Sequence, residues 1–235
     1  MLEVSASGIN LYLQCPYAFK LKYIDKVEIQ QPDTTALITG KLVHKCLELY
    51  FKDKMNNGET YFKPTDYMKQ AIEDYKYLNP LLLDEAIEEA DHYLTLYNNV
   101  AKTLNPEGAE EYFEMELSSG IILRGYIDLI AREGKKRMLI DFKTTRTTVK
   151  DNAKYTLQLS LYSLTHKADA YYLHYLTPTH IQIKEIKPLD KLILHSIINN
   201  VENSVLNDNF PPTGVVNEIC SSCLYRKVCK FASIK

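Results

Sequence analysis

The stretch Leu139–Thr144, with the sequence Leu-Ile-Asp-Phe-Lys-Thr, places a carboxylate and a cation two residues apart in an apolar run. Side chains alternate between the two faces of a β-strand, so Asp141 and Lys143 point to the same face. Upstream, Gly125–Asp128 (Gly-Tyr-Ile-Asp) lies in a second strand-like run. The short turn between the runs predicts an antiparallel pair, which would bring Asp128 near Asp141. Two neighbouring carboxylates repel each other, so the sequence predicts a divalent cation between them.

This pair of strands suits magnesium chemistry. Mg²⁺ prefers oxygen ligands and keeps several waters, which fits two aspartates and a backbone carbonyl such as that of Phe142. Lys143 could orient or deprotonate a water molecule there and stabilise charge that builds on a phosphate. A D-x-K strand by itself is more often an exposed ion pair, so the neighbouring motifs decide between the two interpretations.

The hydrophobic pattern around the two strands predicts a mixed α/β fold. Helices are expected at 5–15, 17–24, from Thr39-Gly40 onward, from Pro64 or Thr65, at 80–100, at 152–166 and from Pro188. Strands are expected at 111–117, 121–131, 137–142, 170–176 and 181–186, with a break at 105–108. This order predicts a mixed central sheet flanked by helices, with a helical N-terminal elaboration.

Composition limits the possible partners and compartments. The 235 residues are 46% hydrophobic and 25% charged, which is ordinary for a folded soluble protein. The net charge of -2 indicates that nucleic-acid contacts would come from local basic patches or a bound metal. No apolar run approaches the roughly 18 residues that a membrane span needs, and the N-terminus lacks a signal-peptide layout. We therefore expect a cytoplasmic, intracellular and reducing location without a membrane partner.

The cysteines form a second constellation. Three of them crowd into the tail with the spacing C-x2-C-x5-C, namely Cys220, Cys223 and Cys229, and Cys15 lies far upstream next to Pro16. Zinc and iron–sulfur clusters both accept four thiolates, so the spacing leaves both open. Either would join the two ends of the chain and couple strongly to folding. The fifth, Cys46, shares an apolar helix face with Leu42, Leu49 and Tyr50 and is expected in the core.

Two further motifs are individually typical of ordinary helices. They are Gly40-Lys-Leu-Val-His44, and the pair Gln158 and Tyr162, which lie four apart on one helix face. In sequence order, G-x-x-x-H, G-Y-I-D, I-D-F-K-T and Q-x-x-x-Y together resemble the RecB-like branch of the PD-(D/E)xK nuclease superfamily. That branch includes Cas4 and the nuclease domains of RecB, AddB and Dna2. The resemblance extends from Ser7 to Cys229.

The resemblance implies a restriction-endonuclease-like fold and a Mg²⁺- or Mn²⁺-dependent deoxyribonuclease. The family pattern would make His44, Asp128 and Asp141 metal ligands and Lys143 the catalytic lysine. Gln158 and Tyr162 would support the site and the substrate. Many members carry Glu where this chain has Asp141, and aspartate is also used. In Cas4, AddB and Dna2, one cysteine before the nuclease core and three after it hold a [4Fe–4S] cluster; zinc is the alternative. The corresponding ligands here would be Cys15, Cys220, Cys223 and Cys229.

The expected function is hydrolysis of DNA from the ends of single strands, in a Cas4-like protein or a phage or viral RecB-like exonuclease. The sequence has no P-loop motif, so any unwinding must come from a partner such as a helicase; CRISPR adaptation proteins are the other expected partners. Arg146 and Lys150 are expected to contact DNA phosphates, a solvated loop being the alternative.

We expect one nuclease domain over 1–235: a mainly helical part (1–105), a catalytic α/β core (106–205) and a cysteine-rich tail (206–235). Two other functions remain open. One is a non-catalytic DNA-binding or assembly subunit that retains the fold, and the other is a zinc-stabilised RNA-processing protein. The intact Asp128, Asp141 and Lys143 favour the enzyme, because a scaffold has no need of them.

Overall fold

A mixed sheet forms the centre of the computed structural model, which describes residues 2–58, 61–118, 120–147 and 153–232. Its strands are β1 (Leu2–Val4), β2 (Asn105–Ser118), β3 (Ile121–Glu133), β4 (Lys136–Thr144), β5 (Ala170–Leu176) and β6 (Ile181–Glu185). The main helices are α1 (Ala6–Gln14), α2 (Pro16–Phe19), α3 (Thr35–Asn57), α4 (Met68–Ile72), α5 (Pro80–Thr103), α6 (Ala153–Thr165) and α7 (Lys191–Leu206). None of the described helices is long and apolar enough to cross a membrane.

Strand β3 is the hub of the sheet. It pairs antiparallel with β2 along nearly its whole length. Its other edge has two partners: β1 runs parallel beside residues 121–123, and β4 runs antiparallel beside residues 129–133. Parallel pairing of β4 with β5 and antiparallel pairing of β5 with β6 complete the sheet. The edge of β3 is therefore shared, and residues 124–128 lie between its two partners.

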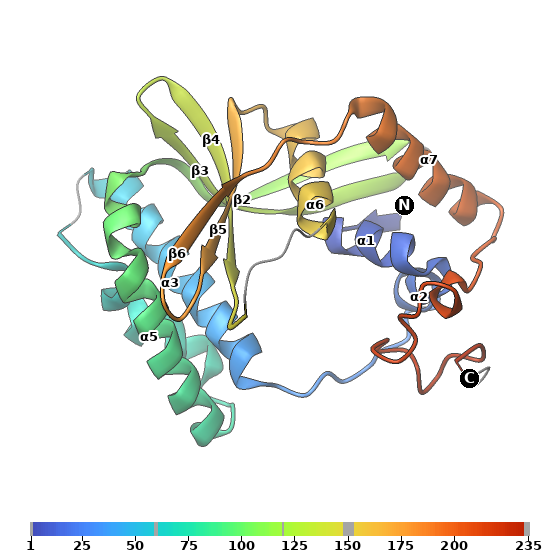
Figure 1. Cartoon of the computed structure of the whole chain (residues 1–235), viewed down its shortest axis with the longest axis horizontal. Coiled ribbons are helices and arrows are strands. Elements are labelled where there is room, and N and C mark those ends of the chain that lie inside the picture. The colour runs from blue at the N-terminus through green and yellow to red at the C-terminus, as the bar shows by residue number, and fades with distance from the viewer. Residues whose placement is uncertain (1, 59–60, 119, 148–152, 233–235) are drawn as a thin grey trace.

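Helices cover both faces of this sheet (Figure 1). One apolar core lies between the sheet and helices α3 and α5, with Leu47, Tyr97 and Phe142 among its buried members. A second lies between the sheet and helices α1, α6 and α7, and includes Ile9 and Leu139. Adjacent residues Leu139 and Ile140 enter different cores, as strand alternation requires. The expected sheet flanked by helices is confirmed.

The hairpin that carries both aspartates is also as expected. Strand β3 ends at Glu133 and β4 begins at Lys136, so the turn is Gly134-Lys135. Gly134 has a φ of +58°, which glycine adopts at no steric cost and which suits a tight hairpin turn.

Several boundaries differ from the expectation, each for a local reason. Helix α3 begins at Thr35, before Gly40, because the Thr34 side chain accepts a hydrogen bond from the Leu37 N–H and caps it. Gly40 lies inside the helix, where a Cβ would stand 3.2 Å from Thr144 Oγ1. The glycine thus permits close approach of α3 to β4. Likewise α7 begins at Lys191, capped by Asp190, and not at Pro188.

The expected break at 105–108 is wrong. This segment begins strand β2, because Pro106 tolerates the start of a strand and a register shift between Pro106 and Gly108 absorbs the irregularity. Strand β1 is missing from the expectation, since its three residues are too short to show alternation. The expected helix at 17–24 is split into α2 and a π-helical turn, Lys20–Ile24.

Candidate functional site

The two aspartates meet at the junction of β3 and β4. Leu129 pairs with Ile140, so the next position in the same register sets Asp128 opposite Asp141. Asp128 Oδ2 accepts a hydrogen bond from the backbone N–H of Phe142 at 2.7 Å. This bond fixes the Asp128 carboxylate against the strand that carries Asp141, as the hairpin reasoning predicted.

Asp141 is held from two sides. Its side chain is buried, with 1% of its surface exposed, and its Oδ2 lies 2.5 Å from Lys143 Nζ. Its Oδ1 accepts a hydrogen bond from Gln158 Nε2 at 2.9 Å. The same nitrogen donates to the hydroxyl of Tyr162 at 2.7 Å, so helix α6 orients the carboxylate through an amide with both of its N–H groups in use.

His44 reaches the site from helix α3. Its Nδ1 lies 3.5 Å from Asp128 Oδ2, and its ring packs edge-on against Phe142. The structure thus brings together His44, Asp128, Asp141, Lys143, Gln158 and Tyr162, all of which the sequence motifs had selected.

Glu110 joins this centre, although no sequence motif indicated it. It lies in β2 between Ala109, which pairs with Leu129, and Glu111, which pairs with Ile127, and so faces Asp128 across the strands. Its φ of +50° is in the left-handed region, where a side chain strains the backbone. The signal was recoverable in principle: extending β2 upstream past Glu111 would have set a carboxylate opposite Asp128.

The electrostatics of the centre show crowded negative charge. Burial opposes ionisation of Asp128, but the charges of His44 and Lys143 outweigh it and hold its pKa below the ordinary value. Burial raises the pKa of Asp141 to about 6 despite the nearby Lys143. Burial, assisted by the charge of Asp128, raises the pKa of Glu110 to about 7. Burial opposes the charge of Lys143, but both aspartates outweigh it and raise its pKa, so the ammonium stays protonated.

The donors fit a divalent cation. His44, Glu110 and Asp128 each offer one ligand atom, and these atoms lie within 4.8 Å of one another. Asp141 adds a buried Oδ2 that no donor among the described residues meets at hydrogen-bonding geometry, although the Lys143 ammonium is near. Carboxylate oxygens with one imidazole suit Mg²⁺ or Mn²⁺, and the positive charge of such an ion would favour ionisation of the two carboxyl groups whose pKa burial raises.

A pH-dependent difference in stability should follow from Glu110. In metal-free protein the folded state keeps a proton on Glu110 up to about pH 7, whereas the unfolded chain releases it near its ordinary pKa. The folded state therefore binds more protons in this window, and that contribution to stability is lost as the pH rises. The quantity to measure is the melting temperature of wild type minus that of Glu110→Gln, both in EDTA. We expect this difference to decrease from about pH 5 to about pH 8.

Taking the difference between wild type and the variant cancels the contributions of other titrating groups to the pH dependence. Burial lowers the pKa of His174 to about 3, which has the opposite pH dependence but is common to both proteins. Mg²⁺ should restore wild-type stability most at the high end of the range, where Glu110 is ionised. A difference that stays flat or rises with pH would contradict the placement of Glu110 in the centre.

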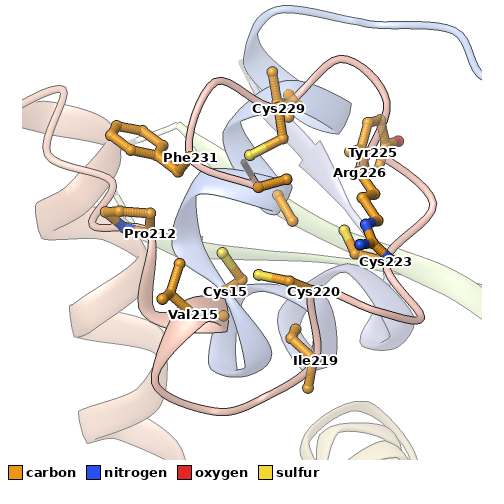
Figure 2. A pocket seen from close by; sticks show the side chains of 14 residues that line it. Cys15, Pro212, Val215, Ile219, Cys220, Cys223, Tyr225, Arg226, Cys229 and Phe231 are labelled. Atoms are coloured by element: carbon orange, nitrogen blue, oxygen red, sulfur yellow. The ribbon is translucent and has the colours of Figure 1, made fainter. Parts of the chain in front are cut away.

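The four cysteines of the expected cluster also meet. Cys15, Cys220, Cys223 and Cys229 line one pocket, together with apolar residues such as Ala18 and Leu21 (Figure 2). The tail is further tied to α1 because Asn217 Nδ2 donates to the Gln14 carbonyl at 2.8 Å. A Cβ on Gly214 would stand 3.2 Å from Cys15 Sγ, so the glycine leaves room beside this thiol.

The spread of the thiols bears on which group they fit. Among the described residues, the centre of His44, Glu110 and Asp128 is the one group of three or more potential ligands with atoms within 4.8 Å of one another. A tetrahedral zinc would hold its sulfurs only about 3.8 Å apart, given Zn–S bonds of about 2.3 Å. In an iron–sulfur cluster each thiolate binds a different iron, so the sulfurs lie farther apart than they do around zinc.

Cys46 is separate from this set. It is fully buried in the core of α3, with its Sγ 4.0 Å from Met68 Sδ, and burial raises its thiol pKa to about 12. The sequence-based expectation of a core residue agrees with this position, and Leu42 and Tyr50 on the same face are buried as well, while Leu49 is partly buried.

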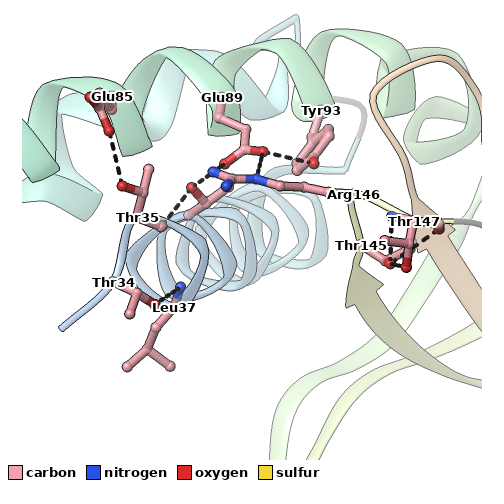
Figure 3. A network of polar contacts seen from close by, with 10 residues as sticks. Thr34, Thr35, Leu37, Glu85, Glu89, Tyr93, Thr145, Arg146 and Thr147 are labelled. Atoms are coloured by element: carbon pink, nitrogen blue, oxygen red, sulfur yellow. Dashed lines mark hydrogen bonds and ion pairs between the residues drawn. The ribbon is translucent and has the colours of Figure 1, made fainter. Parts of the chain in front are cut away.

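Arg146 lies in a polar network beside α5 (Figure 3). Its Nε and Nη2 contact the two carboxylate oxygens of Glu89, each at 2.6 Å. Glu89 also accepts hydrogen bonds from Thr39 and Tyr93. A phosphate contact by Arg146 would have to replace this ion pair, and Lys150 lies outside the described residues.

Comparisons with known proteins place this geometry in a family. No curated protein matches the chain. Among solved structures, the chain is similar to one described as "Crystal structure of SSO0001", with 19% identity, 94% of each chain covered and a TM-score of 0.46. The sequence profile of the PD-(D/E)XK nuclease superfamily matches residues 3–230. That match spans nearly the whole sequence, including every residue of the candidate metal centre and all four clustered cysteines, and the chain therefore belongs to the PD-(D/E)XK nuclease superfamily.

Proposed function

We propose that this chain is a Mg²⁺- or Mn²⁺-dependent DNA exonuclease that works from the ends of single strands. Superfamily membership supports a metal-dependent nuclease in general. The observation that carries the proposal is the gathering of Asp128, Asp141 and Lys143 at one junction of the sheet, with His44 and Glu110 beside them.

Each residue has a distinct role in this proposal. His44, Glu110, Asp128 and Asp141 hold the metal, with the backbone carbonyl of Phe142 as a further expected ligand. When bound, the ion supplies a polarised phosphate and an activated water. The protonated Lys143 neutralises charge that builds on the phosphate during attack.

Gln158 and Tyr162 act through Asp141 and are positioning residues. Gln158 holds one carboxylate oxygen, and the buried Tyr162 hydroxyl holds the second N–H of the same amide. Fixing a ligand by such an outer contact keeps its oxygen aimed at the ion.

The proposal includes a [4Fe–4S] cluster on Cys15, Cys220, Cys223 and Cys229. The pocket that all four cysteines line and its apolar lining support it. The cluster is remote from chemistry in this scheme and holds helices α1 and α2 against the C-terminal tail. We further propose a single domain and an intracellular, reducing setting, in which such a cluster persists.

Two features support the preference for DNA ends: the proposed cluster, which joins the N-terminal helices to the tail, and the net charge of the chain. A chain of net charge -2 has no broad basic surface with which to grip a duplex. The N-terminal helices, pinned to the tail, would roof a passage beside the metal centre, and a roofed passage favours strands that thread from an end. Unwinding would come from a helicase partner, or ends would be supplied by CRISPR adaptation proteins in a Cas4-like setting.

The test compares four substrates with Mg²⁺ or Mn²⁺: linear single-stranded DNA, the same sequence circularised, blunt duplex DNA and linear RNA. We expect linear single-stranded DNA to be degraded fastest and circles to be largely spared. Equal rates on linear and circular DNA would mean an open cleft and endonuclease action. Preferential cleavage of RNA would favour an RNA-processing enzyme, and no cleavage of any substrate would favour a DNA-binding or assembly subunit.

A further inference from the structure

A groove lined by Gln158 and Tyr162 runs beside the candidate metal centre. It is open to solvent and extends from Gln158 and Tyr162 to the tail around Cys223. Its walls come from helices α1 and α6, strand β3 and the cysteine-rich tail. We call it the α1–α6 groove. At one end it touches the two residues that position Asp141, so whatever lies in it approaches the metal centre.

The sheet itself explains why the α1–α6 groove exists. Strand β3 is bordered by β1 as far as Leu123 and by β4 from Leu129 onward. Residues between those partners face the groove, and Arg124, Gly125 and Tyr126 line it. Tyr126 is two residues before Asp128 in β3, so this end of the groove lies close in the chain to the metal ligand.

The charge of the groove contrasts with that of the chain. Lys22, Arg124 and Lys154 line it, and no Asp or Glu is among the described residues that do so. Arg124 pairs with Glu3 at 2.6 Å, but both side chains are about half exposed, at 49% and 47%. Such exposed ion pairs contribute little and exchange readily with a phosphate. The groove is therefore a local cationic strip on a protein of net charge -2.

Aromatic rings alternate with these cations. Tyr126 is 55% exposed, and its ring lies 5.3 Å from that of Tyr112. The ring centroid of Tyr155 lies 5.0 Å from Lys143 Nζ and 4.7 Å from Lys154 Nζ. Tyr155 thus contacts the proposed catalytic lysine directly and also lines the groove.

We propose that the α1–α6 groove is the track for a single nucleic-acid strand, in which Tyr126 and Tyr155 stack on bases while Lys22, Arg124 and Lys154 contact phosphates. This inference rests on the proposed function, because the strand is its substrate. Aromatic platforms alternating with cations are how proteins hold single strands without reading their sequence. An acidic polypeptide would use the cations but gain little from exposed rings. The track also replaces Arg146 as the principal phosphate contact, since Glu89 already holds that guanidinium.

The test measures binding of a fluorescent oligothymidine by anisotropy in EDTA, so that binding is separated from cleavage. Tyr126→Ala should weaken binding about 5- to 100-fold, the value of one lost base stack, whereas Tyr126→Phe should bind like wild type. Lys154→Ala should reduce the salt slope, log K against log salt concentration, by about 0.7. Matched controls outside the groove are Tyr77→Ala, at a tyrosine 77% exposed, and Lys69→Ala.

The outcomes separate this inference from the proposed nuclease activity. If wild type cleaves DNA but Tyr126→Ala and Lys154→Ala bind and cleave as it does, the track is overturned and the nuclease stands. If wild type binds through Tyr126 and Lys154 but cleaves nothing, the track stands and the nuclease fails. Failure of wild type to bind the oligonucleotide, or tighter binding of polyglutamate that is insensitive to Tyr126→Ala, would overturn the track.

Discussion

Replacing Asp141 with alanine is expected to abolish DNA cleavage, and Lys143→Ala is expected to reduce it by about 100- to 1000-fold. Asp141 is proposed as a metal ligand and its carboxylate is buried, so its replacement would remove one of the ligands. Lys143 Nζ is held 2.5 Å from Asp141 Oδ2 and stays protonated, so its loss removes charge stabilisation and leaves the ligands in place. Activity is measured on linear single-stranded DNA, and metal affinity by calorimetric titration with Mn²⁺.

The two variants should differ in what they lose. Asp141→Ala should lower both Mn²⁺ affinity and turnover, whereas Lys143→Ala should bind Mn²⁺ and lose turnover alone. Lys136→Ala is the matched control, because Lys136 begins the same strand β4 at the end away from the metal centre and is 42% exposed. Wild-type turnover in both purified active-site variants would remove Asp141 and Lys143 from the chemistry.

The parts of this site that the sequence predicted are those set by short-range geometry. Strand alternation fixed the shared direction of Asp141 and Lys143, and a two-residue turn fixed the register that opposes Asp128 to Asp141. Helical spacing placed Gln158 and Tyr162 on one helix face, and the Gln158 amide does donate a hydrogen bond to the Tyr162 hydroxyl. In each case the partner lies on the same element or the next one along the chain.

The parts that the sequence did not predict depend on contacts between distant elements or on irregular backbone. Glu110 itself has a left-handed backbone, and it lies between the expected break at 105–108 and the expected strand start at Glu111, so neither pattern included it. Arg146 looked like an available cation, but its partner Glu89 is on α5, far away in sequence. The α1–α6 groove combines the first helix, the middle of β3 and the tail, so no local pattern could reveal it.

Loss of the proposed iron–sulfur cluster is expected to have the largest effect on stability. Protein purified without oxygen should be brown, with broad absorption near roughly 400 nm, and should contain iron and sulfide. A crosslink that joins Cys15 to Cys220 closes nearly the whole chain, and constraining a loop of that length contributes roughly 5 kcal/mol to folding free energy. Replacing any of the four cysteines with alanine should therefore bleach the protein and lower the melting temperature by about 10 °C or more.

Cys46→Ala is the matched control for this cluster. Its thiol is fully buried in the core against Met68 and is held protonated, so its removal should leave the colour and iron content unchanged and cost only about 1 kcal/mol of packing.

Cys15→Ala has a second readout, the binding of single strands. Without its ligand from the N-terminal helices, the proposed cluster could not hold α1 against the tail, and both of these segments line the α1–α6 groove. Binding of single strands should then weaken although Asp128, Asp141 and Lys143 are untouched. Stoichiometric zinc without iron in protein prepared anaerobically would refute the cluster, and full strand affinity in bleached Cys15→Ala protein would show that the groove keeps its shape without the cluster.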